Sequence, residues 1–346
     1  MSALLKVIQG TRVGDSIGLP MEDFPPHRIS NLRWTTPLQQ RFVFDHGMWS
    51  DDTEHTLLLI EAVMESEQNV DRFQKVFSKK LCFWLTMLPP GIGIATLRSL
   101  LRRVTGHSLS KSAVFSAGNG PSMRAAALGV LFANEPSKRL AYNHAQVTVT
   151  HSDPKALYAA ELVVEIAASF TNELTDISPV LNECSKRSAN PEWQRLIAIL
   201  MESHAKGRPI SETLHQLNIC LRKGVSGYSY HTVPVAIALG LKHQWHFENT
   251  LTELISLGGD TDTTAAIAGA LCSLHPHSHI PKSWDQRYLE WPLTAERMNR
   301  ITHQIEQGQS ARYYHWAFWP FYLMCNIIQL HCILFHLFRG LITRTK

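Results

Sequence analysis

The chain carries the stretch Gly258-Gly259-Asp260-Thr261-Asp262-Thr263 directly before the apolar run Ala265-Ala266-Ile267-Ala268. A second polar cluster, Ser50-Asp51-Asp52-Thr53, stands before the apolar run Thr56-Leu57-Leu58-Leu59-Ile60. Ser, Thr and Asp are preferred residues at helix N-termini, and both following runs are typical of helices. The two clusters therefore predict two helices, far apart in the chain, whose first turns carry the same kinds of polar group.

The composition of these clusters indicates more than helix capping. One cap needs a single oxygen, whereas each cluster has two carboxylates and at least one hydroxyl, and the second adds a Gly-Gly pair that permits close backbone approach. Aspartates this close repel one another unless a hard cation is present, and carboxylate and hydroxyl oxygens are the ligands that magnesium and manganese prefer. If the clusters meet in the fold, they supply four carboxylates, enough for a binuclear metal centre.

The overall composition is that of an ordinary globular protein, with 346 residues of which 45% are hydrophobic and 18% charged. The formal net charge of +4 is small for this length, so we expect no general nucleic-acid binding. The six cysteines form no Cys-x-x-Cys pair, and the first residues lack the apolar core of a signal peptide. These features predict a cytoplasmic protein.

Apolar residues recur at spacings of three and four through most of the chain, which predicts an all-α fold. The predicted helical segments are 2–9, 55–66, 72–88, 94–104, 121–133, 154–169, 193–205, 211–222, 233–242, 248–257 and 263–274. The run Val147-Thr148-Val149-Thr150 resembles a strand, but we expect little β structure. The predicted loops are 20–50, 171–192 and 275–293, and the predicted domains are residues 1–310 and a C-terminal segment, 311–346.

Two further turns stand before apolar runs. Gly118-Asn119-Gly120-Pro121 and Thr150-His151-Ser152-Asp153-Pro154 each place a proline at a plausible first helical position. Either turn alone is explained by a capped helix. If these ends and the two acidic clusters converge, however, the cleft suits a substrate with a diphosphate and a vicinal diol.

Six motifs together resemble the ADP-ribosylglycohydrolase family, whose members resemble the dinitrogenase reductase-activating glycohydrolase. Besides the clusters and turns above, they include Gly14-Asp15-Ser16-Ile17-Gly18 with Glu22, Trp49 before Ser50, Ser122-Met123-Arg124, and Gly227-Tyr228 to Ala236. Their order and spacing are similar to the family over roughly residues 6 to 275, and six motifs in register are far more specific than any one alone.

The resemblance implies an orthogonal multi-helix bundle with two Mg²⁺ or Mn²⁺ ions at the base of a cleft for ADP-ribose. The metal ligands that it implies are Ser50, Asp51, Asp52, Asp260, Asp262 and Thr263. Family members commonly have Thr where this chain has Ser50, but the hydroxyl is kept. By the same resemblance, Asp51 and Asp262 are catalytic, and Glu22 matches a residue with an acid or base role in some members.

The implied substrate-binding residues are Asn119, Gly120, Met123, Arg124, His151 and Tyr228. Asp15 has two interpretations: it lies near a C-terminal helical turn with Gly18, or it braces the metal ligands by accepting hydrogen bonds. We favour the first.

The C-terminal residues 316–338 form an apolar run long enough to cross a bilayer, followed by Arg339, Arg344 and Lys346. Asn326, Gln329, His336 and Arg339 fall on one side of a helical wheel, and only His331 lies off it. This pattern favours an amphipathic helix docked on the domain or on a partner. Attachment to a membrane surface and true spanning are the alternatives, in that order.

The leading functional hypothesis is a metal-dependent hydrolase that removes ADP-ribose from a modified acceptor. It would cleave an N- or O-glycosidic bond at the anomeric carbon of the distal ribose. A non-catalytic ADP-ribose-binding regulator that keeps the cleft is the alternative, and a purely structural metal is a third. The expected partner is an ADP-ribosylated protein or another ADP-ribosyl acceptor, whose chemical identity the sequence leaves open.

Overall fold

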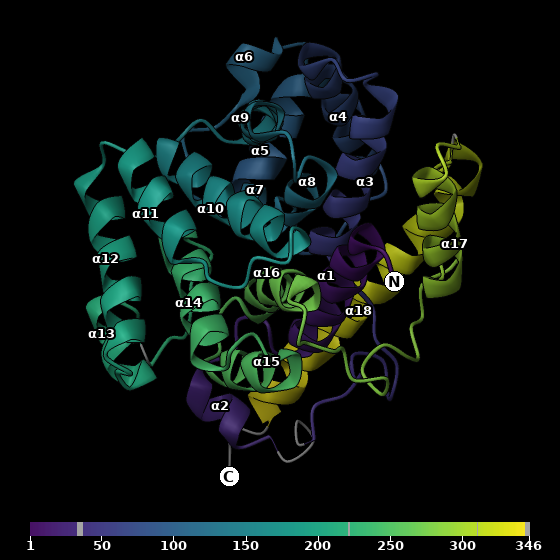
Figure 1. Cartoon of the computed structure of the whole chain (residues 1–346). Helices are drawn as coiled ribbons and strands as arrows, with labels where there is room; N and C mark the ends of the chain where they lie inside the picture. Colours follow the sequence, from purple (N-terminus) through teal and green to yellow (C-terminus); the bar gives the residue numbers. More distant parts are fainter. Residues whose placement is uncertain (33–36, 221, 310, 343–346) are drawn as a thin grey trace.

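The computed structural model describes residues 1–32, 37–220, 222–309 and 311–342, with side chains up to His336. Over these ranges the chain forms eighteen α-helices, two 3-10 turns and no strand, which confirms the all-α prediction (Figure 1). The helices are α1 (Ala3–Gly18), α2 (Pro26–Ser30), α3 (Asp51–Glu65), α4 (Val70–Leu85), α5 (Ile94–Val104), α6 (Leu109–Ser112), α7 (Gly120–Met123), α8 (Ala126–Leu131), α9 (Pro136–Thr150), α10 (Pro154–Thr171), α11 (Ser178–Arg187), α12 (Pro191–Ala205), α13 (Ile210–Gln216), α14 (Ser229–Lys242), α15 (Phe247–Ser256), α16 (Thr261–Leu274), α17 (Ala295–Glu306) and α18 (Trp319–Ile342). The 3-10 turns are η1 (Leu19–Met21) and η3 (Trp316–Phe318).

Helices α1 and α16 lie against each other at the centre of the molecule (Figure 1). Glycines make this close packing possible. A Cβ atom on Gly14 would lie 2.0 Å from the Ala265 carbonyl oxygen, and one on Gly10 would lie 2.3 Å from the Gly269 carbonyl oxygen. Real side chains do not approach backbone this closely, so the glycines set the distance between the two helices. As a result, the C-terminal half of α1 lies beside the polar start of α16.

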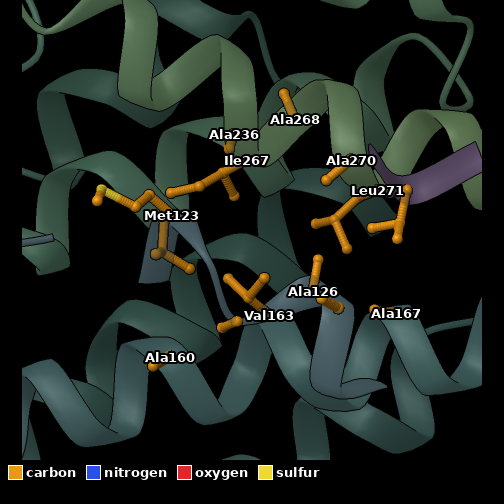
Figure 2. Close-up of a cluster of buried hydrophobic side chains, with 14 of the residues drawn as sticks. Met123, Ala126, Ala160, Val163, Ala167, Ala236, Ile267, Ala268, Ala270 and Leu271 are labelled. Carbon is orange, nitrogen blue, oxygen red and sulfur yellow. The ribbon is translucent and has the colours of Figure 1, made fainter. Parts of the chain in front are cut away.

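Small apolar side chains fill the space around this pair. Figure 2 shows residues of α7, α8, α10, α14 and α16 facing one another in the buried core. Those labelled are Met123, Ala126, Ala160, Val163, Ala167, Ala236, Ile267, Ala268, Ala270 and Leu271. Because alanine adds only a methyl group, these helices pack closely and hold the starts of α7 and α16 in fixed positions.

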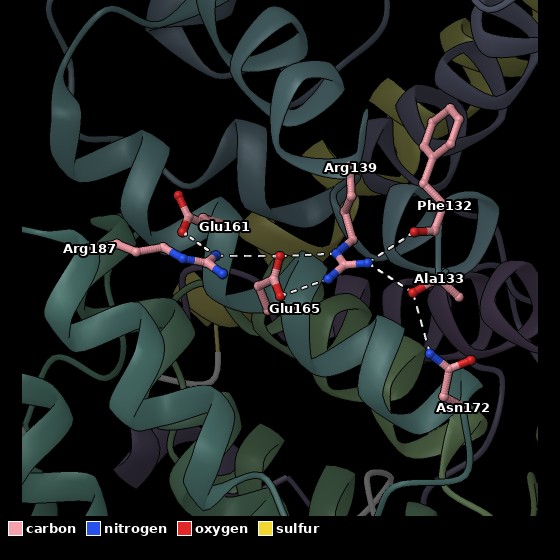
Figure 3. A network of polar contacts seen from close by, with 7 residues as sticks. All are labelled: Phe132, Ala133, Arg139, Glu161, Glu165, Asn172 and Arg187. Atoms are coloured by element: carbon pink, nitrogen blue, oxygen red, sulfur yellow. Dashed lines mark hydrogen bonds and ion pairs between the residues drawn. The ribbon is translucent and has the colours of Figure 1, made fainter. Parts of the chain in front are cut away.

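A buried ionic network ties α9 to α10 and α11 (Figure 3). The Arg139 guanidinium donates to both carboxylate oxygens of Glu165, at 3.0 and 2.9 Å, and also to the Phe132 carbonyl oxygen. Arg187 of α11 pairs with Glu161 at 2.9 Å and with Glu165 at 3.6 Å. The bidentate geometry fixes both distance and orientation, so the network sets the position of α9, whose C-terminal end reaches the cleft.

All eleven predicted helical segments contain helix, although their boundaries differ. The first helix continues to Gly18, and the segment 121–133 divides into α7 and α8. Helices α2 and α11 lie inside the predicted loops 20–50 and 171–192, and α9 and α17 were not predicted. The strand-like run Val147–Thr150 is the last turn of α9.

The C-terminal segment lies against the helical domain. The backbone amides of Tyr313 and Tyr314 donate to the Glu61 carboxylate. Asn326 of α18 donates to the Met87 carbonyl oxygen at 2.8 Å, and Gln329 donates to the Trp49 carbonyl oxygen at 3.2 Å. The division into domains at residue 310 stays a prediction.

Candidate metal centre and cleft

Asp15 fixes the start of α3 against α1. Its carboxylate accepts hydrogen bonds from the Ser50 amide at 2.9 Å, from the Thr53 amide at 3.1 Å and from the Thr53 hydroxyl at 2.6 Å. The carboxylate is fully buried. Asp15 fits both interpretations: it lies in the last turn of α1, where its carbonyl oxygen accepts from the Leu19 amide, and its side chain braces the start of α3. The sequence does not show which helix end Asp15 meets. An acidic residue within the largely apolar α1 was nevertheless a usable signal that this side chain has a buried polar role.

Three aspartates form the centre of the site. Asp15, Asp52 and Asp262 are buried, and each offers one carboxylate oxygen within 4.8 Å of the others. Asp52 Oδ2 accepts from the Ser50 hydroxyl at 2.9 Å and from the Thr263 hydroxyl at 3.2 Å. Among the described residues, Asp52 Oδ1 and Asp262 Oδ1 are buried and have no hydrogen-bond partner. Buried oxygens of this kind are costly unless a donor or a cation meets them.

The electrostatics of the cluster also fit a divalent cation. Burial, together with Asp15 and Glu54, raises the pKa of Asp51 to about 8. Burial raises the pKa of Glu22 to about 8 as well, with further contributions from Asp260 and other acids. The pKa values of Asp52 and Asp262 lie well above the ordinary range, because both are buried and face other carboxylates. Several neighbouring carboxylates can all be ionised only if a positive charge lies beside them. Their carboxylate oxygens, with the hydroxyls next to them, are ligands that Mg²⁺ and Mn²⁺ prefer.

The turn at 118–121 reaches the metal cluster through Asn119. Its side-chain amide donates to Asp260 Oδ2 at 2.7 Å, and its backbone amide donates to the Gly227 carbonyl oxygen at 3.0 Å. A Cβ atom on Gly227 would lie 2.9 Å from Asp260 Oδ2. The turn that carries Asn119 and Gly120 thus converges with the start of α16, as the sequence predicts.

Arg124 lies inside the fold rather than on its surface. The side chain is fully buried, and its guanidinium donates to Gln146 Oε1 at 2.8 Å and to the Thr150 hydroxyl at 3.0 Å, and lies 3.0 Å from His55 Nδ1. These bonds occupy the groups that a ligand would need. In this structure Arg124 holds the end of α9, and its predicted contact with substrate stays a prediction.

His151 and Met123 are also buried. The His151 ring lies beneath the glycine turn, because Cβ atoms on Gly118 and Gly120 would be 3.1 and 3.2 Å from ring atoms. Its Nδ1 lies 2.8 Å from the Thr150 hydroxyl. Burial, aided by Arg124, lowers the pKa of His151 to about 3, so the ring is neutral. Met123 belongs to the core (Figure 2). Both residues support the turn in this structure, and their predicted contact with substrate stays a prediction.

Tyr228 stands beside this turn and is partly exposed. Its backbone pairs with Gly118, and its hydroxyl accepts from Lys155 Nζ at 2.8 Å and donates to Glu192 at 3.2 Å. Lys155 also pairs with Glu192 at 2.6 Å. The sequence analysis missed Lys155 and Glu192, which come from α10 and α12 and have no motif of their own. They hold the tyrosine ring in place at the cleft.

Fold and site define an all-helical protein with buried carboxylates gathered at helix starts. Residues 2–313 match the family model described as ADP-ribosylglycohydrolase, and the chain belongs to that family. This confirms the resemblance, and membership supports ADP-ribosyl glycohydrolase-type hydrolysis in general terms.

Individual proteins of similar sequence or structure cover most of this chain. An uncharacterized protein of Archaeoglobus fulgidus is 27% identical over 301 residues, 82% of this chain and 92% of the relative. A protein of Acanthamoeba polyphaga mimivirus named "Putative ADP-ribosyl glycohydrolase" is 24% identical over 314 residues, 84% of this chain and 92% of the relative. A solved structure described as "ADP-ribosylglycohydrolase-related protein complex" has a TM-score of 0.65 at 21% identity, covering 88% of this chain and 97% of its own. The last similarity supports the fold alone.

Proposed function

We propose that this chain is a metal-dependent hydrolase that removes ADP-ribose from a modified acceptor. It cleaves the N- or O-glycosidic bond at the anomeric carbon of the distal ribose. The observation that carries the proposal is the pair of buried, unpaired oxygens on Asp52 and Asp262, which lie beside Asp15 at the base of the site. Such an arrangement has the donors of a metal centre and lacks the counter-charge that a purely structural acidic cluster would need.

The residues that would hold two Mg²⁺ or Mn²⁺ ions are Ser50, Asp51, Asp52, Asp260, Asp262 and Thr263. When bound, the ions supply Lewis-acid stabilisation for substrate hydroxyls and lower the pKa of a coordinated water. Asp15 is not one of these ligands, because its carboxylate accepts hydrogen bonds from the amides and hydroxyl at the start of α3. It keeps the ligands of that helix in place.

Glu22 is the residue that we assign to proton transfer. It follows η1, and its pKa is raised to about 8 by burial and by nearby acids that include Asp260 and Asp51. Because bound cations would lower this pKa, the assignment is supported by the nearness of Glu22 to Asp260 and Asp51 rather than by the value itself. Cleavage of a glycosidic bond through an oxocarbenium-like state needs one proton-transfer group for the leaving atom or the water.

Asn119 and Tyr228 are the residues that we assign to the substrate side of the cleft. Asn119 contacts Asp260 directly, so a ligand seated on the 118–121 turn also lies close to the metal ligands. Tyr228 is fixed by Lys155 and Glu192 and presents a partly exposed ring. Together they join the turn to the carboxylate cluster in one binding region.

The test is release of free ADP-ribose from arginine-, serine- and DNA-linked ADP-ribose, with Mg²⁺ or with EDTA. The wild type is compared with Asp262→Asn and with Asp71→Asn, which alters an aspartate in the first turn of α4 far from the cluster. We expect Mg²⁺-dependent release by the wild type and by Asp71→Asn, and a loss of at least about a hundredfold for Asp262→Asn. Binding of ADP-ribose without release from any substrate would instead support the non-catalytic regulator.

A further inference from the structure

The domain-facing side of α18 carries two polar amides, Asn326 and Gln329, beside the buried Tyr322 and Cys325. Asn326 and Gln329 are 5% and 4% exposed, and their side chains donate to backbone carbonyl oxygens of the domain. His336 Nε2 lies 2.8 Å from the Phe42 carbonyl oxygen. A helix on the surface of a water-soluble domain normally turns its apolar side inward and its polar side to water. In α18 these two amides point toward the domain, while large apolar side chains face outward.

The outward side of α18 carries a continuous apolar stripe. Its large side chains recur at helical spacing and are between 37% and 60% exposed: Phe321, Met324, Ile327, Ile328, Leu334 and Phe335. His331 is the one polar residue along this stripe among the described residues, and its Nδ1 is engaged by the Ile327 carbonyl oxygen. An exposed apolar surface of this length indicates that something other than water covers it.

Aromatic side chains extend the stripe at both ends. Trp291 packs edge-on against Phe321 with ring centroids 4.3 Å apart, and Trp316 of η3 is 73% exposed. At the other end a groove of about 640 Å³ separates Phe335 from Phe44, which is 95% exposed. Exposed tryptophans at the margin of an apolar surface are typical of proteins that sit at the lipid–water boundary.

The charge of this part of the chain indicates which kind of partner covers the apolar stripe. Residues 307–346 contain four basic residues, Arg312, Arg339, Arg344 and Lys346, and no aspartate or glutamate. A segment that is apolar and purely basic complements an anionic lipid surface, where each basic residue near the headgroups adds to the attraction. A second copy of the same basic segment would instead be repelled.

We propose that α18 seats this protein on an anionic lipid bilayer, with the helix parallel to the membrane plane. The apolar stripe enters the boundary between headgroups and acyl chains, and the polar side stays hydrogen-bonded to the domain. Spanning does not fit this geometry, because Asn326 and Gln329 would leave their carbonyl partners and enter hydrocarbon without new ones. The inference stands independently of the proposed catalytic function.

The experiment is co-sedimentation of the full-length protein with two kinds of vesicle. One is pure phosphatidylcholine, and the other contains about one third phosphatidylserine. The test variant is Ile327→Ser/Ile328→Ser, and the matched control is Leu101→Ser/Val104→Ser, which removes two similarly exposed apolar side chains from α5. We expect the wild type and the control to bind the anionic vesicles, less strongly at high salt. The test variant should bind at least about tenfold more weakly, since two half-exposed isoleucines no longer enter the lipid.

Three results would overturn the proposal. Equal binding of the wild type and Ile327→Ser/Ile328→Ser would mean that the stripe does not enter lipid. Resistance to alkaline carbonate extraction from membranes of cells that express the full chain would indicate spanning. A dimer in solution that this variant converts to monomer, without vesicle binding by the wild type, would assign the stripe to a second copy. If the double variant does not give a wild-type circular dichroism spectrum, Phe335→Ser replaces it.

Discussion

Without a divalent ion, the buried carboxylates make the folded protein less stable as the pH rises. Glu22 and Asp51 carry the two clearest values, with pKa raised to about 8 in the folded state. A group whose folded-state pKa is raised binds its proton more tightly in the folded state than in the unfolded state. The stability that it contributes is therefore present at low pH and is lost as the pH rises through about 8.

The size of the effect follows from these shifts. Between about pH 7 and about pH 8.5, each group with a folded pKa near 8 and an unfolded pKa near 4 loses about 1.2 kcal/mol of stability. Glu22 and Asp51 titrate together, because Asp51 is one of the acids that raise the pKa of Glu22. The pair loses up to about 2.5 kcal/mol, which lowers the melting temperature of a protein of this size by about 3 °C. The buried, neutral histidines His55 and His151 do not interfere, because their contribution changes only below about pH 7.

Thermal unfolding followed by circular dichroism measures this directly, in EDTA and in Mg²⁺ at both pH values. In EDTA the wild type and the control Asp71→Asn should each lose about 3 °C in melting temperature between the two pH values. Glu22→Gln or Asp51→Asn should lose no more than about half as much, because removing one acid also lowers the pKa of the other. Saturating Mg²⁺ should remove most of the loss, because the ion binds the ionised carboxylates and only in the folded state. A melting temperature in EDTA that stays constant or rises with pH would refute the account of the cluster.

Three further changes test the packing around the site. Gly14→Ala should lower the free energy of unfolding in urea by about 1–3 kcal/mol and weaken Mg²⁺ binding, because it forces α1 away from α16. The control Gly93→Ala, with open space around it, should change stability by less than about 0.5 kcal/mol. Equal effects of the two substitutions would contradict the packing argument. Arg124→Ala should cost about 3 kcal/mol in the same assay, because several buried partners lose their donor. If the variant loses only ADP-ribose affinity and keeps its stability, the result would contradict this role and support the predicted contact with substrate. Truncation after Arg312 should lower the melting temperature, because it removes Tyr313 and the amides that satisfy a buried glutamate; an unchanged melting temperature would show that the segment adds nothing to the domain.

Much of the helical frame could be predicted from the sequence because long apolar periods and N-terminal caps are local signals. Asn69, Asp153 and Asn190 all cap helices with their side chains in the expected way. Of the helices that were missed, α17 has such a cap in Thr294, whereas Glu135 at the start of α9 makes no side-chain cap bond. Helix α9 ends in the β-branched run Val147–Thr150, which favours a strand locally, and its helical state depends on tertiary contacts such as Arg139 with Glu165.

The candidate site could be predicted in part for the same reason. Ser50, Asp52, Asp262 and Thr263 stand at helix starts, and the structure brings them together. The roles of other residues depend on how deeply their side chains are buried, and the spacing of motifs in the sequence does not show this. Arg124 and His151 belong to motifs near the carboxylate cluster, yet their side chains are buried, and only the tertiary structure shows that Asp15 meets the start of α3.

The central claim is that the buried aspartates hold catalytic metal, and one measurement tests it most directly. The wild type and Asp262→Asn are depleted of metal with EDTA, Mg²⁺ is returned in steps, and release of ADP-ribose from a modified acceptor is followed over time. The account predicts that release by the wild type returns with Mg²⁺ and saturates, while the folded variant stays inactive at every concentration. Release by metal-depleted wild type, or full activity of Asp262→Asn, would contradict it.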